Sequence, residues 1–469
     1  MHVTRGGGAT WANVTPKIPG APKFAYVSKV EPSRADEGTV YVSFDGHRTG
    51  DYGTHLYASS DYGATFRSIA ANLPKGEVVR TVTEDQKNPD VHYVSTETGR
   101  WVSVDRGRAW TRVRANLPTV PVYEITQHAR DNAMILATHG RAIWILDDMT
   151  LFQSWTQAQS RDAWVYGSRA ATLRLPTSDQ ERGFQGDMLL LGENPPMAAT
   201  IAYVTRVKPD SVRIEIRDAA GAVVRQVKGD TAKATRPAMG LNIARWDLRI
   251  EPLPEPKSGA SPAENPFGGG GGGREGPYVL PATYVATVFV NGKSIGATDV
   301  VVRSDPESQV ATADRKANFE LSKELQGING WLADAVTAVK QVNMQLALIR
   351  KELGDSTKVL PAYRASLDTL AKMIAPLKRK FLVRDEGEEI EFSSEMFRQV
   401  LTFKLSGLAG DLGGFLSGPT AQNLRTMEEL RKEIPESVTE TNALVTRFSA
   451  FVKQLSDAGV YPVMPKVVK

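Results

Sequence analysis

The chain has no cysteine among its 469 residues, so disulfide bonds, thiolate metal sites and cysteine nucleophiles are excluded. It also has no apolar run close to the roughly 18 residues that a membrane-spanning helix needs. Met1 is not followed by the basic and then apolar segment of a secretory signal. Taken by themselves, these features predict a cytoplasmic protein.

Strong net charge is missing as well: 57 Lys and Arg face 53 Asp and Glu, which leaves a formal charge of +4. Without a dense basic run, this balance gives no indication of nucleic-acid binding. Hydrophobic residues make up 41% and charged residues 23%, which is typical of a soluble globular protein. The length fits two to four domains of about 100 to 200 residues each.

Catalytic signatures are scarce. The chain has no H-E-x-x-H helix, no D-x-D-x-D-G loop and no G-x-S-x-G elbow, so metal-dependent and serine hydrolysis lack support. Asp147 and Asp148 are adjacent and would point to opposite faces of a strand, which argues against an acid/base pair for glycoside cleavage. No metal site and no cofactor are predicted. The histidines are His2, His47, His55, His92, His128 and His139.

What the chain does contain is a repeat. The pattern S-x-D-x-G-x-(T/A)-(F/W) occurs twice, each time followed by a tail ending in N-L-P. A degenerate third copy runs from Thr4 to Trp11, with Gly6 in place of the aspartate. The copies are about 40 to 55 residues apart, a period typical of propeller blades. The repeated residues are Ser59, Asp61, Gly63, Thr65 and Phe66 in one copy, and Ser103, Asp105, Gly107 and Trp110 in the other.

Each of these residue types has a structural task in a hairpin turn. Aspartate accepts hydrogen bonds from turn amides, glycine adopts a positive φ, and the closing aromatic residue packs between adjoining sheets. Asp61 and Asp105 are therefore interpreted as structural rather than catalytic residues.

The pattern resembles the Asp-box, or BNR, repeats of sialidases, xyloglucan-cleaving glycoside hydrolases and sortilin-type propellers. The run from Asn132 to Asp148 is similar to the closing blade of large bacterial BNR-repeat proteins labelled sortilin-like or glycosyl hydrolase. The resemblance implies a partial propeller of three to four blades over residues 1–152, with further blades upstream of Met1. It also implies a secreted or periplasmic location, and Asp-boxes that lie away from the ligand face.

A second β domain is expected at residues 199–305, after a connector at residues 153–198. Residues 212–217 alternate apolar and polar side chains, and Asn291-Gly292 marks a hairpin turn. Inward-facing Trp246 and Tyr284 favour an Ig-like sandwich, and the surrounding phrases resemble a FlgD-type module. Residues 254–276 include six consecutive glycines and predict a disordered insertion.

From residue 306 to 469 the apolar residues follow helical spacing. An unbroken stripe from Leu321 to Leu353 predicts one long amphipathic helix, and shorter stripes follow it. Short connections favour an antiparallel bundle over an intermolecular coiled coil. The whole chain is thus predicted to be a multidomain β plus α protein.

For ligand binding, the densest polar and aromatic group of the repeat region is His139, Arg141 and Trp144. The alternative for these residues is a hydrogen bond between blades and a packed tryptophan. The predicted function is a non-catalytic extracytoplasmic scaffold for a protein or glycan ligand. The alternative is a glycoside hydrolase of the same propeller type whose catalytic residues lie upstream of Met1.

Overall fold

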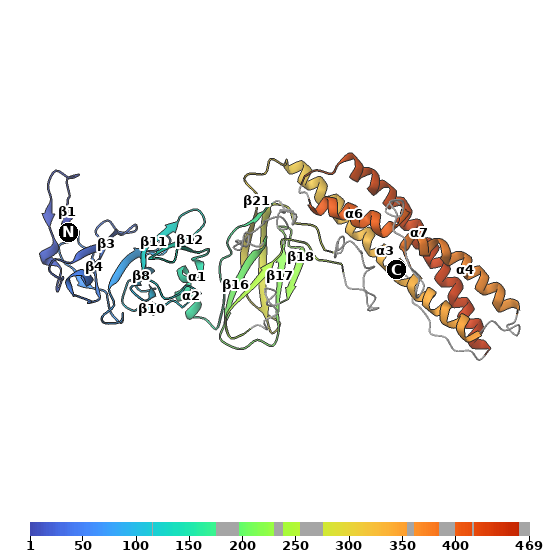
Figure 1. The fold of residues 1–469 in the computed structure, drawn as a ribbon, viewed down its shortest axis with the longest axis horizontal. Coiled ribbons are helices and arrows are strands. Elements are labelled where there is room, and N and C mark those ends of the chain that lie inside the picture. Colours follow the sequence, from blue (N-terminus) through green and yellow to red (C-terminus); the bar gives the residue numbers. More distant parts are fainter. Residues whose placement is uncertain are drawn as a thin grey trace.

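The computed structural model describes residues 1–114, 116–174, 197–228, 238–253, 275–353, 361–383, 399–414 and 417–458. Within these ranges the chain is a mixed β and α protein, as predicted. Sheets of two to four short strands come first, a three-stranded and a five-stranded sheet follow, and long helices form the C-terminal region (Figure 1). Most of the expected insertion at 254–276 lies outside the described residues, as does most of the segment 175–198.

The N-terminal region consists of antiparallel sheets built from consecutive strands. A short hairpin of β1 and β2 precedes two four-stranded sheets and one three-stranded sheet. We refer to β3 to β6 as the first sheet, β7 to β10 as the second and β11 to β13 as the third. Their strands are β1 His2–Val3, β2 Ala12–Asn13, β3 Tyr26–Pro32, β4 Val40–Asp45, β5 His55–Ser59, β6 Arg67–Ser68, β7 Val79–Glu84, β8 His92–Thr96, β9 Arg100–Ser103, β10 Thr111–Arg112, β11 Val122–His128, β12 Ala133–Thr138 and β13 Ile143–Leu146.

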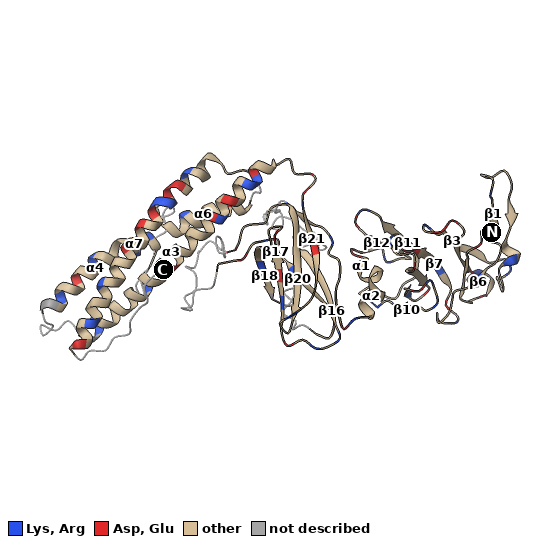
Figure 2. Ribbon diagram, turned by 180° about the vertical axis from the view of Figure 1, so that it is seen from behind, with Lys and Arg blue, Asp and Glu red and all other residues tan. Residues whose placement is uncertain are grey.

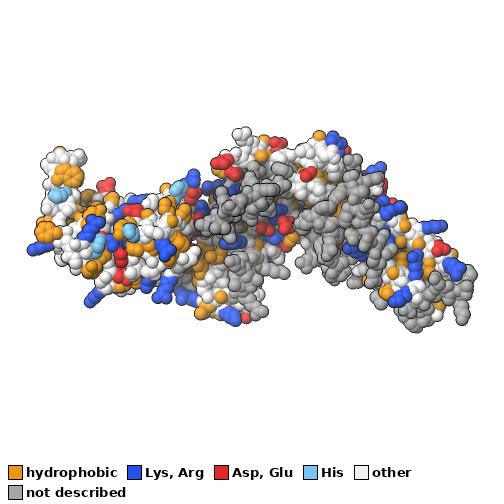
Figure 3. All heavy atoms as spheres, viewed as in Figure 1, with side chains coloured by type: hydrophobic (Ala, Val, Ile, Leu, Met, Phe, Trp, Pro, Cys, Tyr) orange, Lys and Arg blue, Asp and Glu red, His pale blue; other side chains and the backbone are white. Residues whose placement is uncertain are grey.

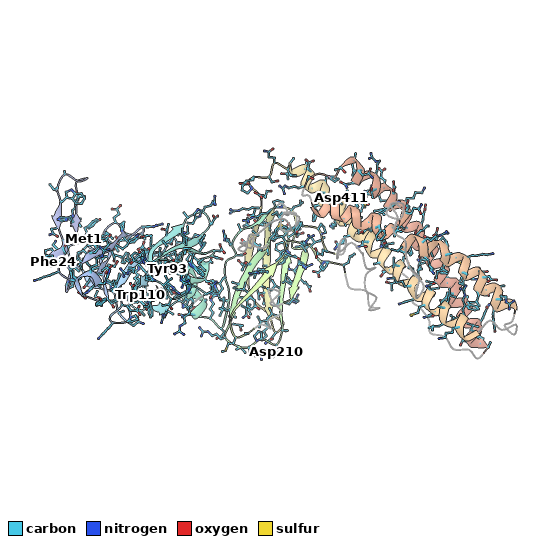
Figure 4. The ribbon with its side chains drawn as sticks, viewed as in Figure 1. Met1, Phe24, Tyr93, Trp110, Asp210 and Asp411 are labelled. Atoms are coloured by element: carbon cyan, nitrogen blue, oxygen red, sulfur yellow. The ribbon has the colours of Figure 1, made fainter. Side chains whose placement is uncertain are left out.

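Neighbouring sheets pack face to face through their first strands, because β7 contacts both β3 and β11. Trp110 fills the space between the first and second sheets and is only 3% exposed. Its indole N–H donates to the Ile69 carbonyl at 2.8 Å, and it packs in one core cluster with Leu56 and Leu73. Figure 4 labels Trp110 and Tyr93 in this N-terminal region.

The repeated turns share one hydrogen bond. The Ser59 hydroxyl accepts from the Gly63 amide at 3.0 Å, and the Ser103 hydroxyl accepts from the Gly107 amide at 2.8 Å. In the degenerate copy, Thr4 accepts from the Gly8 amide at 2.9 Å. The glycine adopts a positive φ in every copy, which a residue with a Cβ rarely tolerates. The third copy therefore keeps the turn geometry although its aspartate is replaced.

The middle region has one three-stranded sheet, β14-β16-β19, and one five-stranded sheet, β15-β21-β20-β17-β18. Within it, β15 and β21 run parallel, whereas the other pairs are antiparallel. The strands are β14 Ala163–Val165, β15 Ala171–Leu173, β16 Ala199–Thr205, β17 Val212–Arg217, β18 Val223–Lys228, β19 Gly240–Trp246, β20 Ala282–Val290 and β21 Lys293–Ser304. Two short helices, α1 Thr150–Gln153 and α2 Trp155–Gln159, precede them.

The core between these two sheets contains the aromatic residues expected there. Trp246 is fully buried and meets Tyr284 edge to face, with ring centroids 5.2 Å apart. Their polar atoms are satisfied locally, since Trp246 donates to the Arg249 carbonyl and Tyr284 to the Leu280 carbonyl, both at 2.8 Å. Asn291 and Gly292 both have positive φ and close the β20–β21 hairpin.

Residues 153–198, expected to connect the β regions, contain two short strands. Strands β14 and β15 lie within residues 153–198, and each joins one of the two middle sheets. Periodicity does not predict them because each strand has only three residues, too few for a clear alternation.

The C-terminal region is helical: α3 Thr312–Leu353, α4 Pro361–Phe381, α6 Leu401–Gly414 and α7 Ala421–Asp457. These helices lie side by side (Figure 1) around one shared apolar core that includes Leu325, Leu370, Leu405 and Phe448. Thr420 caps α7 by accepting from the Asn423 amide, and Asn423 caps it in return. Lys and Arg alternate with Asp and Glu along these helices (Figure 2).

Changing Trp110 to alanine is expected to loosen the contact between the first and second sheets. The loss of a buried tryptophan should cost about 3 to 5 kcal/mol of local stability, because a cavity and an unpaired Ile69 carbonyl remain. Hydrogen–deuterium exchange of peptides covering β5 and β7 measures this opening separately from the other regions.

Trp11→Ala is the matched control for that change. Trp11 is 61% exposed in the equivalent slot of the degenerate copy, so its removal should change exchange by less than about 0.5 kcal/mol. Equal effects of the two substitutions would show that the indole between the sheets does not hold them together.

Candidate functional site

Charged and aromatic side chains gather at one end of the three N-terminal sheets. Asp45 ends β4, Glu97 and His139 directly follow β8 and β12, and Arg80 and Tyr123 stand at the second positions of β7 and β11. In antiparallel sheets the end of each second strand lies beside the start of the first, so the topology brings these residues together. Several pale blue histidines appear on this N-terminal part in Figure 3.

Arg80 is the centre of this cluster. Its guanidinium is buried between two carboxylates from different sheets and binds Asp45 of the first sheet on one side. On the other side its Nε donates to Glu97 of the second sheet at 2.7 Å. Because a buried guanidinium requires compensation, both carboxylates hold Arg80 in a fixed orientation.

An aromatic row extends from Arg80 toward solvent. The guanidinium carbon lies 4.8 Å from the centre of the Tyr123 ring, a cation–π distance. The Tyr123 ring lies against His139, with centroids 5.3 Å apart and planes inclined by 31°. Tyr123 is 46% exposed, so one part of this row is open to a ligand.

Asp45 also orients His47, whose Nδ1 lies 2.5 Å from the carboxylate. Burial raises the pKa of Asp45, but the hydrogen bonds from His47 and the charge of Arg80 outweigh it and hold the pKa below its ordinary value. Asp45 is therefore ionised at neutral pH and cannot donate a proton as a general acid there.

A second group of charges lies on the first strands. Lys29 of β3 lies 2.6 Å from Glu124 of β11 and 3.8 Å from Glu31. Burial raises the pKa of Glu31, and the charge of Lys29 offsets only part of this effect. Since the ammonium lies between the two carboxyl groups, they do not form an open pair with room for a sugar or an attacking water.

Two further carboxylates are buried and saturated. Glu84 accepts from the Ser33 hydroxyl at 2.8 Å and from the Tyr41 hydroxyl at 3.1 Å. Asp85 accepts from the Tyr93 hydroxyl at 2.8 Å. The Glu84 bonds link the first and second sheets, and the Asp85 bond lies within the second sheet. Both carboxylates are buried, which favours a structural role.

The three predicted ligand residues do not form one site. His139 joins the aromatic row at the end of the sheets. Trp144 belongs to β13 and donates through its indole N–H to the Arg141 carbonyl at 2.8 Å, within its own hairpin. Trp144 lines a cavity beside the second sheet, and Arg141 is exposed. Strand alternation explains the separation, because neighbours in a hairpin diverge to different faces.

The turn aspartates lie at the opposite end of the sheets. Since β5 runs antiparallel to β4, Ser59 pairs with Val40, at the far end from Asp45. Asp61 accepts from the Thr65 hydroxyl and amide, which lower the pKa of its carboxyl to about 2. Asp105 accepts from the amides of Arg108 and Ala109 at 3.0 Å. In both copies these contacts of the aspartate are to residues of its own turn.

The adjacent acids after β13 also have local partners. Asp148 accepts from the Thr150 amide at 2.9 Å at the start of α1. Asp147 faces Arg169 at 3.6 Å and remains exposed. Their geometry gives no support to an acid/base pair.

Sequence reasoning missed Asp45, His47, Arg80 and Glu97. A signal was present in the repeat, since polar residues fall at equivalent strand ends in successive copies. Their approach could not be seen because residues 35 positions apart, such as Asp45 and Arg80, meet only after neighbouring sheets pack.

In the described ranges no group of three His, Asp or Glu side chains is placed to hold a metal ion. No helix in the described part of the chain is both long and apolar enough to cross a membrane.

No family model matches the chain, and no curated protein does. Among solved structures it is similar to the GH74 xyloglucanase of Xanthomonas campestris at 15% identity and a TM-score of 0.23, covering 60% of this chain and 37% of that one. The extracellular domain of the one-component system BT4673 of B. thetaiotaomicron matches at 10% identity and a TM-score of 0.20, with 60% and 31% covered. The GH74 enzyme of Niastella koreensis matches at 12% identity and a TM-score of 0.22, covering 43% of this chain and 30% of that one.

The chain thus spans about a third of the length of these solved structures. TM-scores this low do not establish a shared fold.

Acid should destabilise the contact between the first and second sheets through His92, which is fully buried against the Tyr41 ring. Burial lowers its pKa, and Glu84 offsets this only in part. An unfolded histidine titrates near pH 6.5. As the pH falls below about 6.5, the unfolded chain binds a proton that the folded chain refuses, so stability is lost down to the folded pKa.

His92→Phe removes this proton but keeps a ring against Tyr41. The opening free energy of β4 and β8, from hydrogen–deuterium exchange corrected for intrinsic rates, should fall less between pH 7.5 and 5.5 in the variant. One proton accounts for at most about 1.4 kcal/mol per pH unit. The same acid sensitivity in both proteins would rule out His92 as its source.

Proposed function

We propose that residues 1–152 are blades of an Asp-box propeller that binds a carbohydrate outside the cytoplasm, without cleaving it. The binding surface is the end of the sheets that carries Arg80, Tyr123, His139 and His47. The observation that carries this proposal is the half-exposed Tyr123 ring, fixed between the buried Arg80 guanidinium and His139.

The chemistry of this surface suits a sugar. The aliphatic C–H face of a sugar ring packs on an exposed aromatic ring, and its hydroxyls pair with imidazoles and carboxylates at the edge. Glu97 and His47 supply such groups at the two sides of Arg80 and are partly exposed. Holding the aromatic ring in place before the ligand arrives lowers the entropic cost of binding.

The blade assignment draws on two features. Successive antiparallel sheets pack through their first strands, and an aromatic residue from one turn lies between two sheets. The shared serine or threonine to glycine bond supports the identification of the turns as Asp-boxes.

The middle region is proposed to be an Ig-like sandwich. The Tyr284 hydroxyl bonds to the carbonyl four residues upstream, as in a tyrosine corner, and Trp246 lies in the core beside it. The sandwich and the helical bundle would position the binding surface. The connector between the β regions would consist of the residues of 153–198 that lie outside β14 and β15.

A non-catalytic role agrees with the state of the carboxylates. Asp45 and Glu97 bind Arg80, Glu31 and Glu124 flank Lys29, and Glu84 and Asp85 are buried. None of them combines exposure to a ligand with a second carboxylate across open space. The hydrolase alternative would need its catalytic pair elsewhere.

The test is a binding screen of the full chain against sialosides, xyloglucan and other β-glucans, followed by calorimetry on any ligand found. Tyr123→Ala should weaken binding at least about tenfold, because the packing face is lost. Tyr62→Ala is the matched control, since Tyr62 is 52% exposed but stands in the turn at the opposite end.

Binding that Tyr123→Ala leaves intact, or that Tyr62→Ala weakens equally, would contradict the proposed surface. Released sugar that disappears when one carboxylate is replaced, with the fold unchanged, would contradict the non-catalytic role.

A further inference from the structure

A cavity of about 980 Å³ opens beside the interface between the second and third sheets. The segment that follows β10 and ends at Pro118 contributes Val113 and Leu117 to the lining. The third sheet contributes Leu136 and Trp144. These same residues belong to the packed core between the two sheets, so the cavity is continuous with an established interface. Residues of α2, β16 and β19 complete its lining.

The contact between the first and second sheets shows what occupies the equivalent space there. The segment that follows β6, residues 69–74, binds Trp110 through three hydrogen bonds. Its indole donates to the Ile69 carbonyl at 2.8 Å, its amide donates to the Asn72 side chain at 2.7 Å, and its carbonyl accepts from the same side chain at 2.9 Å.

The second sheet has an equivalent binding site for an aromatic residue. Its tail repeats the sequence pattern of the first, so that Val113, Asn116 and Leu117 stand where Ile69, Asn72 and Leu73 stand. The backbone agrees, because Val113 donates to the Arg100 carbonyl at 2.8 Å as Ile69 donates to that of Leu56 at 3.0 Å. Within the described part of the chain, neither the Val113 carbonyl nor the Asn116 side chain has a hydrogen-bond partner.

The third sheet also lacks a strand that its neighbours have. Strands β6 and β10 pair with β5 and β9, whereas β13 pairs with β12 alone among the described strands. Ile143 and Ile145 of β13 are 67% and 62% exposed. An unpaired strand edge with exposed isoleucines is a ready template for another strand.

The lining of the cavity is positively charged. The described residues that line the cavity include Arg100, Arg112, Arg114 and Arg206, and none of them is acidic. A segment with an aspartate five residues before its aromatic residue, as in the repeated turn, would complement these arginines.

We propose that this cavity and the β13 edge bind a polypeptide segment carrying a further copy of the turn, from outside residues 1–469. Its aromatic residue enters the cavity, where its N–H reaches the Val113 carbonyl and its backbone pairs with Asn116. The residues that follow pair antiparallel with β13 as a fourth strand.

The probe is a fluorescently labelled peptide with the sequence of residues 59–69 and the substitution Phe66→Trp. It should bind the full chain with a stoichiometry of one, as measured by anisotropy. The Phe66→Ala peptide should bind at least about tenfold more weakly, because it lacks the aromatic side chain.

Changes in the chain test the receptor itself. Asn116→Ala should weaken binding about three- to tenfold, through the loss of hydrogen bonds, without unfolding the protein, since Asn116 is exposed. Gln422→Ala on the exposed face of α7 is the control and should leave binding unchanged. Peptide binding should also slow hydrogen–deuterium exchange of residues 143–146, which an apolar ligand in the cavity would not do.

Equal binding of the two peptides, no binding, or unprotected β13 amides would overturn the proposal. The competing occupant is a second copy, because Trp11 stands in the same slot of β1–β2 and is exposed. Analytical ultracentrifugation distinguishes it: a chain that remains monomeric supports the proposal. Self-association that Trp11→Ala abolishes would assign the cavity to a second copy and overturn it.

Discussion

The N-terminal region depends on one kind of contact, an aromatic side chain at the end of a turn that packs against the preceding sheet. None of these sheets can bury both faces alone, since each has three or four short strands. Trp110 joins the first and second sheets, because its buried ring fills the space between them and its indole N–H donates to the Ile69 carbonyl. The serine-to-glycine bond of each turn fixes the direction in which the aromatic residue leaves.

This contact also sets the place of the candidate binding surface. Once adjacent sheets are aligned, their first strands bring Arg80 against Asp45 on one side and Tyr123 on the other. The turns that achieve the alignment lie at the opposite end of the sheets. The turn residues and the residues of the candidate surface are therefore separated by the length of a strand, so changes at one end need not disturb the other.

The site that Trp110 occupies and the cavity beside the second sheet are built in the same way. The two tails have the same pattern, but only the first meets a turn with its aromatic residue within the described chain. Exposed isoleucines on β13 and the apolar cavity beside it are costly in water. A segment that covers both would extend the packing rule of the first two sheets to the third.

The sequence by itself determined the elements with strong local signals. Turn residues at fixed spacing, the Asn291-Gly292 hairpin and the long stripe starting at Leu321 each depend on neighbours in the chain, so the period of the pattern predicts them. The mixed β and α character followed from these signals. Buried Trp246 and Tyr284 were predicted for the same reason, since alternation assigns one strand face to the core.

Only the tertiary structure decided which residues form a surface together. Asp45, Arg80 and Tyr123 come from three sheets, and no local pattern records the angle at which those sheets pack. Packing also separated His139 from Trp144, which lie close in sequence but leave their hairpin on different sides. Strands β14 and β15 formed because partners distant in the chain supplied the hydrogen bonds that three residues cannot supply alone.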